Sequence, residues 1–218
     1  MEPLRPIRRR LLREAAYEAI RDAIVRGDLA PGTSVSNADL AERLGLSRAP
    51  VRDALARLAD EGLVETKPQS YTRVTALVPR DVRDAAAVVR VMHELAASTA
   101  VPVLTPEHVT AMRDANRRFE AATRAGDIDA AMRADDELHD VLVRVCANRA
   151  VAATIERYTP LIRRLERRQF SRASARRSVT LHGQLIDACA VGDAEQATRV
   201  TARIWRALED LAEAPPTH

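Results

Sequence analysis

The 218-residue chain has few aromatic residues and few cysteines. Phe, Trp and Tyr make up 3% of the residues, with a single Trp, whereas apolar residues as a whole make up 46%. Such a core consists of Ala, Val, Leu and Ile and suits long helices better than a sheet. The cysteines, Cys146 and Cys189, lack CxxC spacing. Two such isolated cysteines indicate a reducing, cytoplasmic location, and we expect no disulfide framework.

Long apolar runs and familiar catalytic motifs are missing too. The longest apolar runs are too short to span a bilayer, so no membrane association is expected. The basic N-terminus lacks the apolar segment of a secretory signal. The sequence contains no Gly-rich phosphate loop, GxSxG elbow or HExxH helix, so we expect a protein that is not an enzyme.

Charge is distributed unevenly along the chain. Residues 1–80 contain 14 Lys and Arg against 11 Asp and Glu, whereas residues 81–218 contain 20 of each kind. The whole formal excess of +3 therefore lies in the first part. This asymmetry is typical of a phosphate-facing module joined to a neutral one.

Residues 36–66, SNADLAERLGLSRAPVRDALARLADEGLVET, predict two short helices. In the first, apolar residues recur at helical spacing between Ser36, a suitable N-cap, and Gly45, a suitable left-handed C-terminal residue. In the second, Ser47 is the expected N-cap and Pro50 lies in the first turn. Two such helices joined by a short Gly turn predict a helix-turn-helix.

Two arginines, Arg48 and Arg52, lie four residues apart on the free face of the second predicted helix. Arginines near the start of a recognition helix contact base edges and phosphates. The alternative is an ordinary helical hairpin with a solvated, charged face.

A β-hairpin is predicted to follow the two helices. Residues 63–66 and 72–77 have strand character, and residues 68–70 connect them. A hairpin at this place makes a winged helix. Lys67 and Arg73 on the wing suit the DNA backbone or the minor groove.

Three segments carry a family resemblance: IRDAIVRGDLAPGTSVS, LAERLGLSRAPVRDALARLADEGLVE and the wing. On these, residues 12–77 resemble the DNA-binding domain of the GntR family of bacterial transcription regulators. The resemblance implies that the chain binds a double-stranded DNA operator. It implies DNA contacts by Arg43, to phosphate, and by Ser47, Arg48, Ala49 and Arg52.

The wing tip departs from the family pattern, which often has Gly where this chain has Ser70 and Tyr71. Either Tyr71 contacts the sugar–phosphate backbone, or the hairpin turns differently. Both residues are counted among the candidate DNA contacts. Asn37 is a second departure, because the family often has an acidic residue there.

The rest of the chain is predicted to be helical. The expected fold is mainly α, with a winged helix-turn-helix of three helices and a small hairpin, followed by an all-α bundle of about six helices. The expected parts are a basic arm (1–11), the winged helix (12–77) and the bundle (78–218). Bundle helices are predicted over 79–101, 105–126, 127–148, 150–171, 175–191 and from 193, with Asp127 and Asp193 as caps.

The strings VRVMHELAA, DDELHDVLVRVCANRA and LHGQLIDACAVGDAEQATRV make residues 78–218 resemble the FCD-type ligand-sensing domain of the FadR subgroup. The resemblance implies effector binding and a homodimer. A two-fold dimer would place two recognition helices on a palindromic operator.

Many FCD domains hold a divalent metal through Asp-x3-His and two later histidines. Asp135 and His139 match the first pair and His182 the next position, but the last expected position, 22 residues further on, is Ile204. Asp/His/His ligands can still hold Zn²⁺, Ni²⁺ or Mn²⁺ if water or a carboxylate effector completes the site. The alternative is an i,i+4 pair of Asp135 with His139, and a core histidine at 182.

Effector contacts are expected on the first bundle helix. Arg90 and Glu94 match an Arg and a Glu often found there, and Arg90 could pair with an effector carboxylate. The alternative is a structural Arg90–Glu94 pair. His93 could supply a fourth nitrogen ligand, but nothing in the spacing requires it, and we expect a structural or pocket-lining role.

Together these features predict a DNA-binding transcription regulator, expected to be a repressor, controlled by a small organic acid. Two alternatives remain: a metal-responsive regulator in which the ion itself is the effector, and an architectural DNA binder whose bundle only dimerises.

Overall fold

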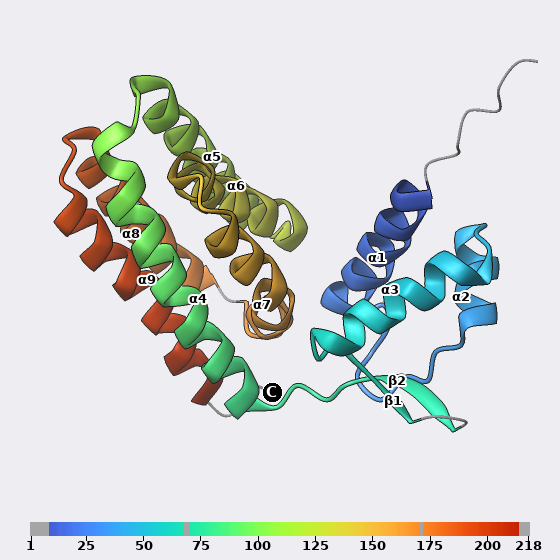
Figure 1. Cartoon of the computed structure of the whole chain (residues 1–218). Coiled ribbons are helices and arrows are strands. Elements are labelled where there is room, and N and C mark those ends of the chain that lie inside the picture. Colours follow the sequence, from blue (N-terminus) through green and yellow to red (C-terminus); the bar gives the residue numbers. More distant parts are fainter. Residues whose placement is uncertain (1–8, 68–69, 171, 214–218) are drawn as a thin grey trace, which may run out of the picture. The chain divides into compact units, whose positions relative to one another are not determined.

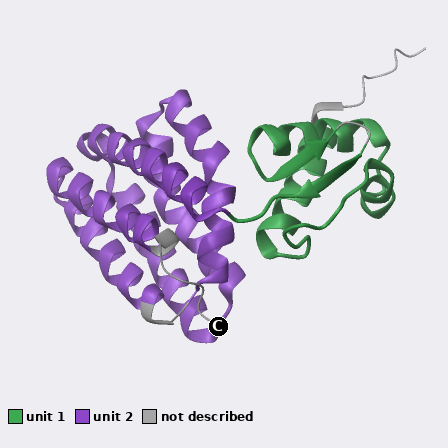
Figure 2. Ribbon diagram, turned by 90° about the horizontal axis from the view of Figure 1, so that it is seen from below, with its two compact units in different colours: residues 1–77 green, residues 78–218 purple. Residues whose placement is uncertain are grey.

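The computed structural model describes residues 9–67, 70–170 and 172–213. The chain forms two compact units, residues 1–77 and residues 78–218 (Figure 2). The predicted fold class is confirmed: the first unit has three helices and a two-stranded hairpin, and the described part of the second is helical.

The helices of the first unit enclose an aliphatic core. Its elements are α1 (Arg9–Arg26), α2 (Asn37–Leu44), α3 (Arg48–Asp60), β1 (Val64–Lys67) and β2 (Tyr71–Val74). Helix α3 packs against both α1 and α2 (Figure 1), and Leu58 and Tyr17 are fully buried. The arm predicted for residues 1–11 is wrong in extent, because residues 9–11 continue α1; residues 1–8 lie outside the described chain.

The turn between α2 and α3 is set by its capping residues. Ser36 Oγ accepts a hydrogen bond from the Asp39 N–H at 3.0 Å, and Gly45 closes α2 with φ of 63°. Ser47 occupies the N-cap of α3 but makes no side-chain capping bond. A cap bonds the second or third N–H of a helix, and the third residue here, Pro50, has none, so one of the two possible partners is absent.

The hairpin is shorter than predicted. Val64 pairs with Val74 and Lys67 with Tyr71 in an antiparallel register. Leu63 is excluded because its N–H bonds the Leu58 carbonyl at 2.9 Å, which closes the end of α3. Strand β2 ends at Val74, opposite the first residue of β1, so the predicted extension to residue 77 is wrong. Of the predicted connection, residues 68–69 lie outside the described chain.

The second unit is a helical bundle with short connections. Its elements are α4 (Pro79–Ala100), the 3₁₀ turn η1 (Val101–Val103), α5 (Pro106–Ala125), α6 (Ile128–Cys146), α7 (Arg149–Arg168), α8 (Arg172–Ala190) and α9 (Ala194–Glu213). Helix α4 packs against α6, α7 and α9, while α5 packs against α6 and α8 (Figure 1). No helix in the described ranges is both long and apolar enough to cross a membrane.

Candidate functional site

Helix α3 turns its apolar side inward and its arginines outward. Val51, Leu55 and Leu58 are buried in the first unit, so Arg48 and Arg52, on the other side of the helix, are exposed. The Arg52 side chain is 70% exposed, with Asp53 3.7 Å away. This is the arrangement that the recognition-helix prediction requires. Their contact with DNA stays a prediction.

Of the remaining candidate DNA contacts, Arg43, Ser47, Ala49, Lys67, Ser70 and Arg73 are exposed, and Tyr71 is partly buried. Arg43 lies in the last turn of α2, 3.9 Å from Asp39. The Arg73 guanidinium pairs with Glu65 and lies over the Tyr71 ring, 4.5 Å from its centroid. Arg73 would therefore exchange an intramolecular partner for any phosphate.

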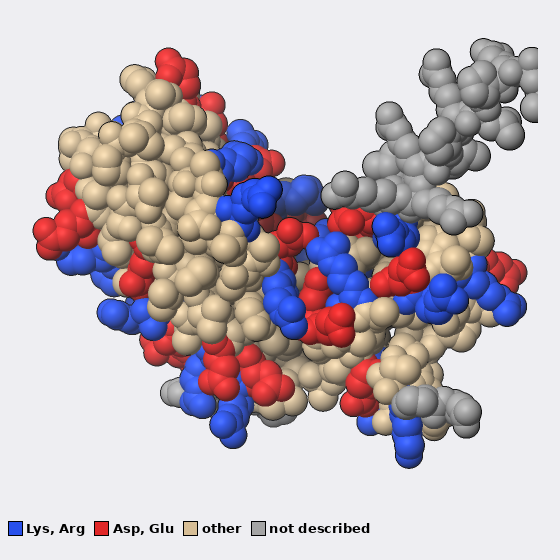
Figure 3. Space-filling view, viewed as in Figure 1, with Lys and Arg blue, Asp and Glu red and all other residues tan. Residues whose placement is uncertain are grey.

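Acidic side chains accompany these arginines over much of the first unit. Figure 3 shows blue and red side chains interspersed on its visible face. The surface of this unit is not uniformly basic. The prediction of DNA binding therefore depends on the exposed arginines of α3 more than on net charge.

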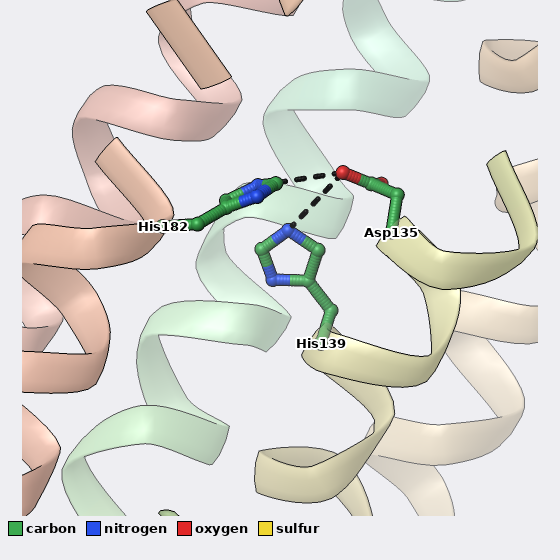
Figure 4. Close-up of side chains that lie close together, drawn as sticks. All are labelled: Asp135, His139 and His182. Carbon is green, nitrogen blue, oxygen red and sulfur yellow. Dashed lines mark ion pairs between the residues drawn. The ribbon is translucent and has the colours of Figure 1, made fainter. Parts of the chain in front are cut away.

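In the bundle, three predicted metal ligands converge. Asp135 and His139 project from α6 and His182 from α8, and the three side chains point toward one another (Figure 4). Asp135 Oδ1 lies 3.3 Å from His182 Nε2 and 4.0 Å from His139 Nε2. One ligand atom from each residue lies within 4.8 Å of the others. We call these residues the Asp135 triad.

The hydrogen bonds of Asn116 define the tautomer of His182. The Asn116 amide Nδ2 donates to the Val179 carbonyl at 3.3 Å, which leaves Asn116 Oδ1 facing His182 Nδ1 at 3.2 Å. Since Oδ1 can only accept, Nδ1 carries the proton and Nε2 presents a lone pair. Burial lowers the pKa of His182 to about 4, so the ring is neutral at pH 7.

The lone pair of His182 Nε2 has no donor in the described chain. Nε2 is buried without a hydrogen-bond partner, and its neighbour is an Asp135 oxygen, which is also an acceptor. Burial raises the pKa of Asp135, but Arg163, His139 and His182 together outweigh burial and keep the pKa below its usual value. Two facing acceptors repel each other unless a cation lies between them, so these residues fit a divalent ion.

Arg163 of α7 compensates part of the buried negative charge. Its Nη2 donates to Asp135 Oδ2 at 2.6 Å and its Nη1 to Glu166 Oε2 at 2.6 Å, and it also pairs with Asp136. One guanidinium thus faces three carboxyl groups. Burial raises the pKa of one of them, Glu166, to about 7, and a divalent ion would compensate the negative charge that Arg163 leaves. Arg163 thus fixes the orientation of Asp135 through Oδ2, and Oδ1 faces the two histidines, where an ion would bind.

A cavity of about 160 Å³ adjoins the triad. Residues of α6, α7, α8 and α9 line it, including Asp135, His139, Arg177, His182, Ile204 and Trp205. Ile204, at the position where the family pattern places a histidine, therefore lines the same cavity as the three predicted ligands. A smaller cavity of about 70 Å³ shares part of this wall.

The expected effector contacts on α4 lie elsewhere. Arg90 Nη1 donates to Glu94 at 2.8 Å and Arg90 Nε to Glu209 at 2.7 Å, as in the alternative of a structural pair, and none of these residues lines the cavity. His93 is buried and stacks on Trp205 at 4.4 Å, outside the set that could share an ion.

Sequence reasoning did not identify Asn116, Arg163 or Arg177 as parts of this site. Arg163 and Arg177 are two of many arginines in α7 and α8, and no spacing distinguishes them. Asn116 reaches His182 only through the packing of α5 on α8.

Comparisons with known proteins agree with this architecture. The model of the bacterial regulatory proteins of the gntR family matches residues 12–74, and the FCD domain model matches residues 75–207. An uncharacterized HTH-type transcriptional regulator of Streptomyces ambofaciens is 30% identical over 208 residues, covering 94% of this chain and 87% of the relative.

Another relative, the HTH-type transcriptional repressor RspR of Escherichia coli K12, is 24% identical over 174 residues, 80% of this chain and 74% of its own. The solved structure of E. coli McbR/YncC has the same fold, with a TM-score of 0.81 at 20% identity over 93% of this chain and 97% of that one. Both named relatives are transcriptional regulators, which confirms the prediction that the chain is not an enzyme. From its two matching domains and these relatives, the chain belongs to the gntR family of bacterial regulatory proteins, with a DNA-binding winged helix-turn-helix followed by an FCD domain.

Proposed function

We propose that this DNA-binding regulator is a repressor that a small organic acid releases from its operator. The main observation that supports an effector site is the Asp135 triad, which adjoins a cavity inside the FCD domain. The buried, unpartnered Nε2 of His182 supports a bound ion as part of that site.

In this proposal Asp135, His139 and His182 hold one divalent ion: Zn²⁺, Ni²⁺ or Mn²⁺. The ion supplies a positive charge and open coordination positions to which a carboxylate binds. Arg163 and Asn116 orient the ligands. Arg177, in the cavity wall, offers a guanidinium to a second anionic group.

The DNA-binding form is proposed to be a homodimer. On α4, Val88, Val91 and Leu95 are 41%, 47% and 43% exposed, and they are spaced by three and four residues, as in a coiled-coil seam. Figure 3 shows a broad uncharged area over α4. A second copy covering this stripe would give a two-fold axis that matches a palindromic operator.

The first test of the site is thermal unfolding of the full-length protein with chelator and with single divalent ions added back. Chelation should lower the midpoint and one ion should restore it, because a ligand of the folded state stabilises it by about 2.7 kcal/mol at a hundredfold excess over Kd. His182→Ala should abolish the response, whereas His108→Ala, on α5 outside the triad, should keep it. A wild-type midpoint that ignores every ion would contradict the metal site.

The test of regulation uses an operator selected from random-sequence DNA. Operator affinity is measured for the ion-loaded protein with and without organic acids. Release by an acid that requires an intact His182 supports the proposal. Release by the ion alone would favour the metal-responsive alternative, and uniform binding to all DNA sequences would favour the architectural one.

A further inference from the structure

The wall that α9 contributes to the cavity differs chemically from the rest of the site. Ile204, 8% exposed, and Trp205, 4% exposed, both belong to it. An aliphatic side chain cannot coordinate an ion, so the protein supplies three ligands and leaves further positions to whatever enters the cavity.

Trp205 adds an unpaired donor to this wall. Its indole Nε1 is buried and has no hydrogen-bond acceptor among the described residues, although buried tryptophan N–H groups usually have one. The ring stacks on His93 with 4.4 Å between centroids and 14° between planes, so it cannot turn freely to find another partner. Because Trp205 lines the cavity, we take a molecule bound in the cavity as the source of the acceptor.

The cavity also limits the size of the ligand. An engineered cavity of about 150 Å³ holds a benzene molecule, with about six non-hydrogen atoms, and the cavity here is about 160 Å³. The adjoining 70 Å³ cavity shares the Asp135 and Glu166 part of the wall. A ligand of about six to ten non-hydrogen atoms therefore fits.

We propose that Trp205 is the specificity-determining residue of this site and that the ligand, not the protein, replaces the missing histidine. The ligand is a small acid with two adjacent oxygen groups, which together complete the coordination of the ion, and one ligand oxygen accepts a hydrogen bond from Trp205 Nε1. This inference rests on the proposed metal site. It requires that ion and acid bind as a pair, each raising the affinity of the other by the same factor.

Trp205→Phe tests the donor, because phenylalanine keeps an aromatic ring beside His93 and removes the N–H. Calorimetric titration of Zn²⁺-loaded full-length protein would use 2-hydroxybutyrate and malonate as bidentate probes and butyrate as the monodentate one. We expect the wild type to prefer 2-hydroxybutyrate over butyrate, and Trp205→Phe to lose about tenfold or more in affinity for the bidentate probes. Equal affinity of the two proteins for those probes would overturn the role of Trp205.

Ile204→His tests the open position. It should tighten Zn²⁺ alone by about tenfold or more, measured by competition with a chelating dye, and should reduce the mutual enhancement between Zn²⁺ and 2-hydroxybutyrate. Arg113→His places the same imidazole at an exposed position of α5, outside the cavity wall; it should bind Zn²⁺ as the wild type does and serves as the control. Unchanged Zn²⁺ affinity and unchanged enhancement in a folded Ile204→His protein would overturn the proposal.

The same titrations distinguish failure of the proposed metal site from failure of the inference about Trp205 and the bidentate acid. If the wild type does not bind Zn²⁺ at all, the proposed metal site itself is wrong. If the wild type binds Zn²⁺ but treats butyrate and 2-hydroxybutyrate alike, only the present inference is wrong.

Discussion

Arg48 and Arg52 are the side chains on which sequence-specific binding should depend most. Their exposure at the start of α3 leaves the guanidinium groups available to a DNA groove. We expect Arg48→Ala or Arg52→Ala to cost about 1–3 kcal/mol of operator binding if the residue contacts a base, with relaxed preference at one base pair. Competition binding with single-base operator variants measures both the loss of affinity and the change in base preference.

Arg113→Ala, an exposed arginine on α5, provides the matched control and should bind operator normally. A uniform loss for Arg48→Ala or Arg52→Ala over all DNA sequences would instead indicate a phosphate contact.

The serines at the starts of α2 and α3 should differ in their effect on stability. Ser36 accepts the Asp39 N–H, whereas Ser47 makes no capping bond. Ser36→Ala should therefore lower the free energy of unfolding by about 1 kcal/mol, and Ser47→Ala should leave it nearly unchanged. Chemical denaturation of both variants gives the comparison; equal losses would contradict this account of the caps.

At the scale of elements, the α2–α3 turn depends on one backbone conformation. Gly45 has φ of +63°, and a Cβ there would meet no atom within 4 Å, so the cost of a side chain is conformational alone. Gly45→Ala should destabilise the first unit by about 1–2 kcal/mol. Gly183, inside α8, has no such φ and equal space, and Gly183→Ala should instead stabilise by about 1 kcal/mol.

Thermal or denaturant unfolding of the two glycine variants provides the measurement. Destabilisation by both substitutions would show that packing, not the left-handed conformation, controls Gly45.

The helices could be predicted because their end signals lie beside them in the chain. Asp127 and Asp193 each cap the N-terminus expected of them, through the N–H groups of Ala130 and Gln196. The hairpin was less predictable because strand ends depend on pairing with a distant segment. Thr33 accepts a hydrogen bond from the Val74 N–H, and the Val35 N–H donates to the Thr72 carbonyl of β2. Its length therefore follows from contacts that no local pattern encodes.

The site was predictable only in part for the same reason. Asp135 and His139 share one helix and could be paired from their spacing, whereas His182 needed the family resemblance. The groups that orient or surround them come from separate helices: Arg163 from α7 and Arg177 from α8. Only the packed bundle shows that Arg90 is engaged with Glu209 and that Arg177 lines the cavity.

For the whole molecule, the exposed stripe on α4 should determine the oligomeric state. Val91→Glu places a charge in the middle of the proposed two-fold contact, and we expect a monomer with strongly weakened binding to a palindromic operator, because avidity is lost. Val103→Glu changes a still more exposed side chain, 63% exposed in η1, and should remain dimeric. Light scattering coupled to size-exclusion chromatography distinguishes the two, and a dimeric Val91→Glu protein would place the interface elsewhere.

The location of the single tryptophan has an optical consequence. Because the chain has no other indole and Trp205 is 4% exposed in the cavity wall, all tryptophan emission of the protein originates at the proposed effector site. The spectrum should be blue-shifted, as for an indole shielded from water. Binding of any molecule in the cavity, whether a natural effector or a member of a screening library, should therefore change the tryptophan emission of the unlabelled regulator.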